Sequence, residues 1–242
     1  MPANPPQPID PASTVRWVAA IATWCAVVIA LFKEDIVKWR RPRLTVTVRM
    51  RAPDCTKTPM FVTKLEVPVG SLTARQRTEM FDGYYFRLWV ENLGRQRAER
   101  VQVYAAKLFK KEADGAFREV QGFLPMNLRW AHSADPKEPL IFEDINPKMG
   151  RHCDLGRITD PKAPIDRLDA VPQDKTILHL DLEVEPATAT HLLPPAIYRL
   201  HLRIGAANAS PVEKQLEISL PGDWYSDQTK MFADGIGISE LN

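Results

Sequence analysis

Sixteen consecutive residues near the start of the chain, Trp17–Phe32, carry no charged side chain. Only Thr23 among them is polar, whereas a helix packed on a globular domain normally keeps a polar face. With Val15 before the run, and Ile36 and Val37 after it, the segment reaches the roughly 17–25 residues that a membrane-spanning helix needs. The sequence therefore predicts one membrane-spanning α-helix.

Positive charge is concentrated after this run. Arg16 alone marks its near edge, and the basic residues that follow are Lys33, Lys38, Arg40, Arg41 and Arg43. By the positive-inside rule, the asymmetry predicts an external N-terminus and a cytoplasmic C-terminal domain at the inner (plasma) membrane. The last four of these basic residues are expected to contact membrane lipid, and Trp17 and Trp39 suit the two membrane interfaces.

The chain divides into three parts on this interpretation. Residues 1–14 form a Pro-rich external tail without a basic residue, whereas a cleaved secretory signal opens with Lys or Arg. Residues 15–41 hold the uncleaved transmembrane helix and the basic juxtamembrane segment. Residues 42–242 are about 200 residues long, which fits one large all-β domain.

Small residues recur along one side of the predicted helix. They are Ala19, Ala22, Ala26 and Ala30. Small side chains let two helices approach closely in lipid, so this stripe predicts helix packing and a homo-oligomer. An alternative is that alanine is simply common in apolar helices.

Composition excludes some classes of protein. The 32 basic and 30 acidic residues leave a net charge of +2, which gives no field that favours nucleic acid. The three cysteines, Cys25, Cys55 and Cys153, have no paired spacing, so we expect no disulfide framework, in agreement with a reducing compartment.

Alternation of apolar and polar residues predicts strands through most of the C-terminal domain. Strands are expected at 44–50, 61–67, 84–90, 101–109, 117–123, 178–184, 198–204 and 216–220, with short ones near 141–142 and 153–158. Asp114-Gly115 predicts a hairpin turn. Prolines recur from 125 to 172, which indicates a long irregular excursion, and a short helix capped by Ser226 or Asp227 is expected to end at Gly235.

Strands 178–184 and 198–204 are adjacent along the chain, and both have one apolar and one polar face. If they pair as a hairpin, Glu183 lies opposite Arg199 and Asp181 lies opposite His201, so that opposite charges meet. Regular strands without alternating long helices favour an all-β, antiparallel β-sandwich.

Two segments carry a family resemblance. VENLGRQRAERVQV, Val90 to Val103, resembles the strand, Asn-x-Gly turn and second strand of CARDB-type and related bacterial immunoglobulin-like domains. PPAIYRLHLRI, Pro194 to Ile204, resembles the strand start of the same sandwiches. The resemblance implies an immunoglobulin-like β-sandwich that acts as a binding or spacer module without catalytic residues. Many such domains are extracellular, whereas the C-terminal domain of this chain is expected in the cytoplasm. They are also more compact, because they lack the long irregular excursion expected here.

Two clusters of polar residues resemble reactive sites. His132, His152, Cys153 and Asp154 are potential zinc ligands, but they lack the paired Cys-x-x-Cys or His-x-x-x-His spacing of structural zinc. His179, Asp181 and His201 resemble a general base, but the charged residues around them are typical of a solvated sheet face. Glycine-rich phosphate loops and nucleophile elbows are missing from the sequence. We therefore expect no enzyme, cofactor or metal.

Bulky residues without clear strand alternation suggest a surface for a protein partner. The candidates are Phe123, Met126, Arg129 and Trp130, together with Tyr85 and Trp89 on the face opposite the predicted core. These residue types are enriched at interface hot spots, although burial in the core is the alternative for the first group.

The sequence thus predicts a single-pass, membrane-anchored cytoplasmic module that binds a protein partner or a small signal. Two alternatives remain open. One is a membrane-disrupting effector that oligomerises through its helix, for which Thr23 is the sole polar residue able to line a pore. The other is a hydrolase that uses His132, His152 or His179.

Overall fold

The computed structural model describes residues 11–66, 75–132, 141–163, 165 and 168–241 of the 242-residue chain. The chain forms two compact units, Met1–Arg41 and Pro42–Asn242.

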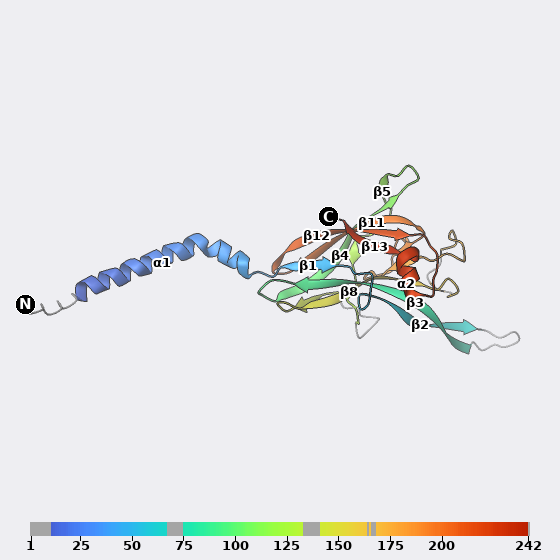
Figure 1. The fold of residues 1–242 in the computed structure, drawn as a ribbon, viewed down its shortest axis with the longest axis horizontal. Helices are drawn as coiled ribbons and strands as arrows, with labels where there is room; N and C mark the ends of the chain where they lie inside the picture. The colour runs from blue at the N-terminus through green and yellow to red at the C-terminus, as the bar shows by residue number, and fades with distance from the viewer. Residues whose placement is uncertain (1–10, 67–74, 133–140, 164, 166–167, 242) are drawn as a thin grey trace, which may run out of the picture. The chain divides into compact units, whose positions relative to one another are not determined.

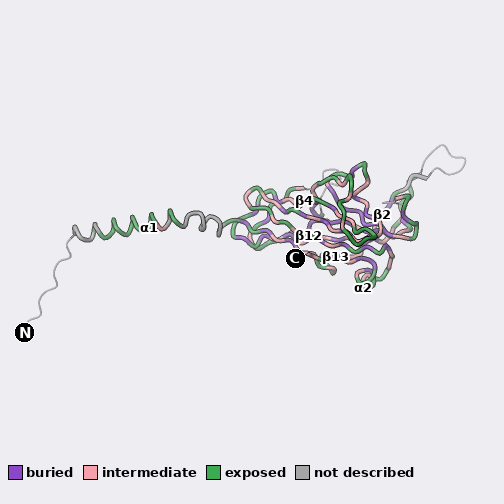
Figure 2. Tube along the Cα trace, turned by 90° about the horizontal axis from the view of Figure 1, so that it is seen from above, coloured by how far each residue is buried: buried purple, intermediate pink, exposed green. Residues whose placement is uncertain are grey.

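Helix α1, Pro11–Arg40, is the only regular element described in the first unit. Figure 2 shows its described side chains as exposed, except for Val28, which is intermediate; the side chains of residues 11–14, 16, 29 and 32–40, among them Lys38, Trp39 and Arg40, lie outside the description. Within the described residues, no helix combines the length and the apolar character required to cross a membrane.

The second unit is built from two antiparallel sheets, drawn as two layers in Figure 1. In the described residues, the first sheet has the order β1-β3-β8-β9-β10, with β2 also paired to β3. Its strands are β1 (Leu44–Thr47), β2 (Cys55–Glu66), β3 (Arg75–Asn92), β8 (Gly150–Thr159), β9 (Leu178–Leu180) and β10 (Leu192–Leu193).

The second sheet has the order β13-β12-β11-β4-β5 within the same described part, and β6 and β7 also pair with β4. Its strands are β4 (Ala98–Lys111), β5 (Phe117–Glu119), β6 (Met126–Asn127), β7 (Glu143–Ile145), β11 (Ala196–Ala206), β12 (Ala209–Leu220) and β13 (Gly237–Leu241). The expected all-β, antiparallel architecture is therefore confirmed.

One apolar core lies between the two sheets. Tyr84, Phe86 and Leu88 of β3 are fully buried, as the alternation of this strand predicted. Leu200 and Leu202 of β11 belong to the same cluster from the other sheet. Each fully buried side chain of this size contributes roughly 1.5–3 kcal/mol, so facing apolar stripes are what hold the sheets together.

The segment from Met126 to Ala131 joins the two sheets at one side. Met126 and Asn127 pair with β4, whereas Leu128 and Trp130 form bridges to Leu182 and Cys153 beside the first sheet. Trp130 is 1% exposed and its Nε1–H donates to the carbonyl of Ile141 at 2.9 Å. This part of the excursion from 125 to 172 therefore closes the core, and β8 supplies a central strand from the same region.

The expected hairpin between strands 178–184 and 198–204 is wrong. β9 pairs with β8 and β10 in the first sheet, whereas β11 pairs with β4 and β12 in the second. Arg199 therefore forms its ion pair with Glu217, and Asp181 forms its pair with Arg157. Cross-strand charge complementarity was a poor guide here, because Asp181 pairs with Arg157 and the Glu183 carboxylate accepts a hydrogen bond from the Asn127 amide.

A short helical segment lies near the end of the second unit, as expected. Asp227 caps α2, Gln228–Lys230, by accepting a hydrogen bond from the Lys230 N–H at 2.8 Å. The following turn, η1, spans Met231–Gly235. Phe232 from this turn packs against Tyr84 in the core, and β13 then adds an unpredicted edge strand.

Candidate functional site: a groove over β4 and β11

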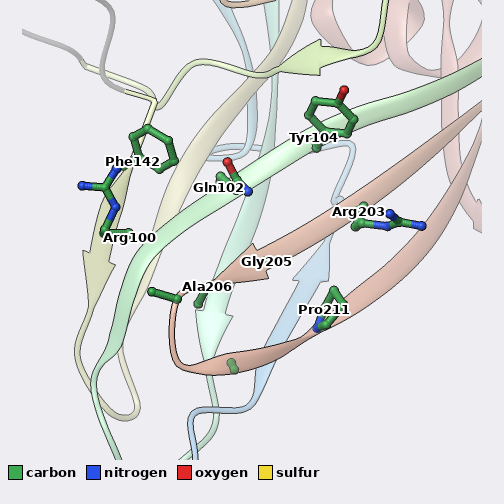
Figure 3. Close-up of a pocket in the computed structure, with 10 residues that line it drawn as sticks. Arg100, Gln102, Tyr104, Phe142, Arg203, Gly205, Ala206 and Pro211 are labelled. Atoms are coloured by element: carbon green, nitrogen blue, oxygen red, sulfur yellow. The ribbon is translucent and has the colours of Figure 1, made fainter.

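A groove with a volume of about 520 Å³ crosses the outer face of the second sheet where β4, β11 and β12 lie side by side (Figure 3). Arg100, Gln102, Tyr104, Phe142, Arg203, Gly205, Ala206, Ala207, Ala209 and Pro211 line it. The groove therefore joins residues that are more than a hundred positions apart in the chain.

Arg100 has an unusual backbone conformation at one side of this groove. Its φ of 51° is in the left-handed region, which costs most side chains roughly 1–2 kcal/mol. The pairing of β4 with β7 shifts register between Ala98 and Val101, and the Arg100 N–H donates to Asp144 Oδ1 at 2.7 Å. This bulge redirects the Arg100 side chain onto the ring of Phe142, 4.4 Å from its guanidinium carbon (Figure 3).

Asp144 holds this corner together because it also accepts a hydrogen bond from the Arg97 side chain. Hydrogen bonds from the Arg100 N–H and the Arg97 guanidinium hold the pKa of Asp144 below its usual range. Within the described residues, the Arg100 guanidinium has no carboxylate at ion-pair distance. Its charge is therefore available to a ligand, while its face rests on Phe142.

The far side of the groove carries a second arginine. Arg203 Nη2 donates to Glu213 Oε1 at 2.8 Å, and both side chains are well exposed. Gln102 and Tyr104 of β4 line the groove together with small residues at and after the end of β11, which are Gly205, Ala206, Ala207 and Ala209. Two arginines, aromatic rings and a stretch of small residues suit an anionic ligand with a flat group.

Charged residues also gather on the outer face of the first sheet, centred on Asp54. This carboxylate is fully buried and accepts two hydrogen bonds from Arg49, at 2.7 and 3.0 Å. His152 Nε2 lies 3.1 Å from Asp54 Oδ1, and the His152 ring packs on Trp89. Burial alone would raise the pKa of Asp54, but the hydrogen bonds from Arg49 and His152 lower it overall.

Two further ion pairs follow on the same face. Arg87 bonds to Asp154 at 2.9 Å, and Arg157 bonds to Asp181 at 2.8 Å. Burial, followed by the charge of Asp181, raises the pKa of Asp154. Burial also raises the pKa of Tyr85 beside them. These side chains satisfy one another, so the cluster is a structural network of ion pairs.

The histidines do not form the sites considered from the sequence. His179 is 2% exposed and packs against His191, rather than lying on a solvated face beside His201, which is in the other sheet. His152 is held by Asp54, whereas His132 is exposed in a turn. Within the described residues, no group of three or more His, Cys, Asp or Glu side chains is arranged to hold a metal.

The residues proposed as a partner surface fall in different environments. Trp130 is buried in the core and is therefore not available to a protein partner, contrary to its prediction as a surface residue, because its ring fills the space between the sheets. Phe123 and Met126 are partly buried against the same core, and Arg129 Nη2 bonds to the Glu183 carbonyl at 3.2 Å. Tyr85 and Trp89 do point away from the core, as predicted, but they lie within the ion-pair face.

Sequence reasoning missed several surface features. Arg100, Phe142 and Arg203 became a site only through sheet pairing and a bulge, for which the sequence carries no signal. Phe61 and Met80 are directly opposite each other on β2 and β3, and they are 73% and 66% exposed. The alternation of residues did not predict this exposed apolar pair.

Comparisons of the chain with family models, curated proteins and solved structures gave no match.

Proposed function

We propose that the chain is a single-pass, membrane-anchored module that binds a small anionic ligand on the cytoplasmic side of the inner membrane. The observation that carries the anchor is the exposure of the bulky apolar side chains of α1. Each is more than half exposed; they are Val15, Trp17, Val18, Ile21, Trp24, Val27 and Leu31. An apolar surface of this kind requires a covering, and lipid covers all sides of a helix at once.

The single polar side chain of the run supports the same proposal. The Thr23 hydroxyl donates to the Ala19 carbonyl one turn earlier, at 2.9 Å. A hydroxyl that is satisfied within its own helix costs little in hydrocarbon. Thr23 therefore gives no support to a polar pore lining, and the anchor is favoured over the membrane-disrupting effector.

The orientation rests on charge. Lys38, Arg40, Arg41 and Arg43 follow the apolar run, whereas Arg16 alone precedes it. By the positive-inside rule, this asymmetry supports a cytoplasmic second unit. The exposed alanines at 19, 22, 26 and 30 offer a surface for a second copy of the helix, so a homo-oligomer is part of the proposal.

An immunoglobulin-like relationship is proposed for the second unit on two features. Two antiparallel sheets pack over one core, and Tyr198 Oη donates to the Pro194 carbonyl at 2.8 Å. A tyrosine that bonds to the backbone a few residues upstream resembles the tyrosine corner of immunoglobulin-type sandwiches. Such domains act by binding, which supports a module without catalytic residues.

The groove is proposed as the ligand site. Its volume of about 520 Å³ lies in the range of small-molecule sites, and the Arg100 guanidinium stacked on Phe142 supplies charge and a flat surface together. The ion-pair face of the first sheet is a weaker candidate, because Arg87 and Arg157 already contact carboxylates.

Two measurements test the proposal. Flotation of the full chain with vesicles, followed by alkaline extraction, tests the anchor; recovery of the chain in the soluble fraction would contradict it. Ligand binding is tested by titrating purified full chain with AMP, adenosine and inorganic phosphate. Binding of AMP that is tighter than that of either part, and lost in Arg100→Gln, is expected, whereas no binding of any of the three would contradict this ligand class.

A further inference from the structure

Three turns and the first residues of the second unit meet at one end of the sandwich. The turn after β3, residues 92–97, bonds to the turn before β8 through the Lys148 N–H and the Asn92 carbonyl, 2.8 Å apart. The turn between β11 and β12 joins them because Asn208 Nδ2 donates to the Arg97 carbonyl at 2.9 Å, and the Ala207 N–H donates to the carbonyl of Glu99 at the start of β4 at 2.8 Å. These turns therefore form one surface.

The chain enters the second unit within this surface. The Arg43 N–H donates to Asn92 Oδ1 at 3.1 Å, and the Leu93 N–H donates to the Arg43 carbonyl at 2.8 Å. Arg43 is two residues after the end of the first unit at Arg41. Leu93 is thus fixed beside Arg43, where the chain enters the second unit.

Basic residues predominate in these segments. Residues 42–43, 92–97, 145–150 and 205–209 contain no Asp or Glu, and their basic residues are Arg43, Arg95, Arg97 and Lys148. The acidic residues that adjoin them are Glu91, Glu99 and Asp144, and Asp144 is in an ion pair with Arg97. The turns themselves therefore carry an excess of positive charge, although the net charge of the whole chain is only +2.

Apolar side chains accompany this charge at the tips of the turns. Leu93 is 39% exposed and Met149 is 57% exposed. The Lys148 Nζ donates to the Leu93 carbonyl at 2.8 Å, which places a cationic group beside Leu93. Apolar side chains surrounded by lysine and arginine are the combination that enters the headgroup region of an anionic bilayer.

We infer that this end of the sandwich docks on anionic phospholipid, with Leu93 and Met149 inserted among the headgroups and Arg43, Arg95 and Lys148 in contact with phosphates. The inference rests on the proposed function, since Arg43 of this surface follows the proposed anchor directly in the chain. Anionic lipid is favoured over an acidic protein because the chain itself delivers Arg43 directly after the proposed anchor.

A fluorescent probe on the full chain tests the inference. Cys25→Ala removes the exposed thiol, while Cys55 and Cys153 are buried. Met149→Cys then carries an NBD label at the docking end, and Ala113→Cys carries the same label beyond β4, roughly 40 Å of extended strand away. Both proteins are reconstituted in phosphatidylcholine vesicles with or without 30% phosphatidylglycerol, a probe composition of about physiological anionic content.

The expected result is an emission at position 149 that is blue-shifted and at least twofold stronger with phosphatidylglycerol, and no change at position 113. Replacing Arg43, Arg95 and Lys148 together by Gln should remove the response. The matched control replaces Lys110, Lys111 and Arg118 by Gln, an equal change of charge at the other end of β4, and should retain it.

The remaining outcomes separate this inference from the proposed function. If the chain floats with vesicles but position 149 responds no more than position 113, the docking surface is wrong and the anchor stands. An equal response with and without phosphatidylglycerol would also overturn recognition of anionic lipid. If the chain does not float at all, the anchor and the docking surface both fail.

Discussion

The backbone N–H of Arg43 donates to the side-chain oxygen of Asn92, 49 residues later, at 3.1 Å. Asn92 is fully buried, and its Oδ1 also accepts from the Gly94 N–H, while its Nδ2 donates to the carbonyls of Gln96 and Ile145. A single amide therefore fastens the start of the second unit to two turns.

Replacing Asn92 by Ala should destabilise the second unit strongly, because it removes the buried hydrogen bonds to the Gly94 N–H and the Ile145 carbonyl and the part-buried bond to the Arg43 N–H. We expect a loss of about 2–4 kcal/mol in the free energy of unfolding, measured by denaturant titration. Asn208→Ala removes two hydrogen bonds at a surface that water can reach, and should lose less than about 1 kcal/mol. Equal losses in the two variants would contradict the role given to Asn92.

Two substitutions of Arg100 distinguish its effect on backbone strain from its effect on ligand binding. Arg100→Gly relieves the left-handed backbone at φ 51° and removes the groove guanidinium, so its unfolding free energy should stay within about 1 kcal/mol of the native value, or above it. Arg100→Val should lose about 1–2 kcal/mol, because a branched side chain opposes that conformation. Both should lose AMP binding, and retained binding in either would exclude the groove.

Asp54 gives the stability of the fold a defined pH dependence. Its pKa in the folded protein lies below the ordinary value of 3.8, so its contribution is present above that pH and is lost as the pH falls through the folded-state value. Asp54→Asn should therefore be less stable than the native chain by about 1–3 kcal/mol at neutral pH. The difference should shrink below about pH 4, and a difference that grows with acid would reverse this interpretation.

The cysteines should differ sharply in reactivity. Burial raises the pKa of Cys55 to about 11 and that of Cys153 well above its ordinary value, whereas Cys25 is exposed on α1. Since the thiolate is the reactive form, a maleimide at neutral pH should label only Cys25 in detergent. Mass spectrometry after digestion measures this, and rapid labelling of Cys153 in the folded chain would show that the core is open.

The alanine stripe on α1 has its own test. Changing Ala22, Ala26 and Ala30 to Leu should abolish cross-linked oligomers of the detergent-solubilised chain, because larger side chains hold two helices apart. Changing Val18, Ile21 and Val28 to Leu adds no comparable bulk and serves as the matched control. Unchanged oligomers in the alanine variant would remove helix packing from the proposal.

Local patterns predicted many elements of the second unit correctly. The alternation from Tyr84 to Val90 identified both faces of β3, Asp114-Gly115 marked the turn between β4 and β5, and Asp227 and Gly235 bounded the final helical segment. Each of these depends on neighbours within a few residues, where side-chain direction and turn chemistry are set by the backbone itself.

The candidate groove could not be predicted in this way. Arg100 and Phe142 meet because a bulge in β4 faces β7, and Arg203 joins them because β11 pairs with β4 across about a hundred residues of intervening chain. The wrong pairing of 178–184 with 198–204 has the same origin, since two strands with similar patterns can join either sheet.

The sequence by itself determined the apolar helix, its basic flank, the faces of the long strands and the class of fold, because hydrophobic periodicity and charge act along the chain. Only the tertiary structure decided which strands became neighbours, buried Trp130, and brought Arg43 beside Asn92 and Arg100 beside Phe142. Those relationships follow from how two sheets share one core, and many local patterns are compatible with more than one such packing.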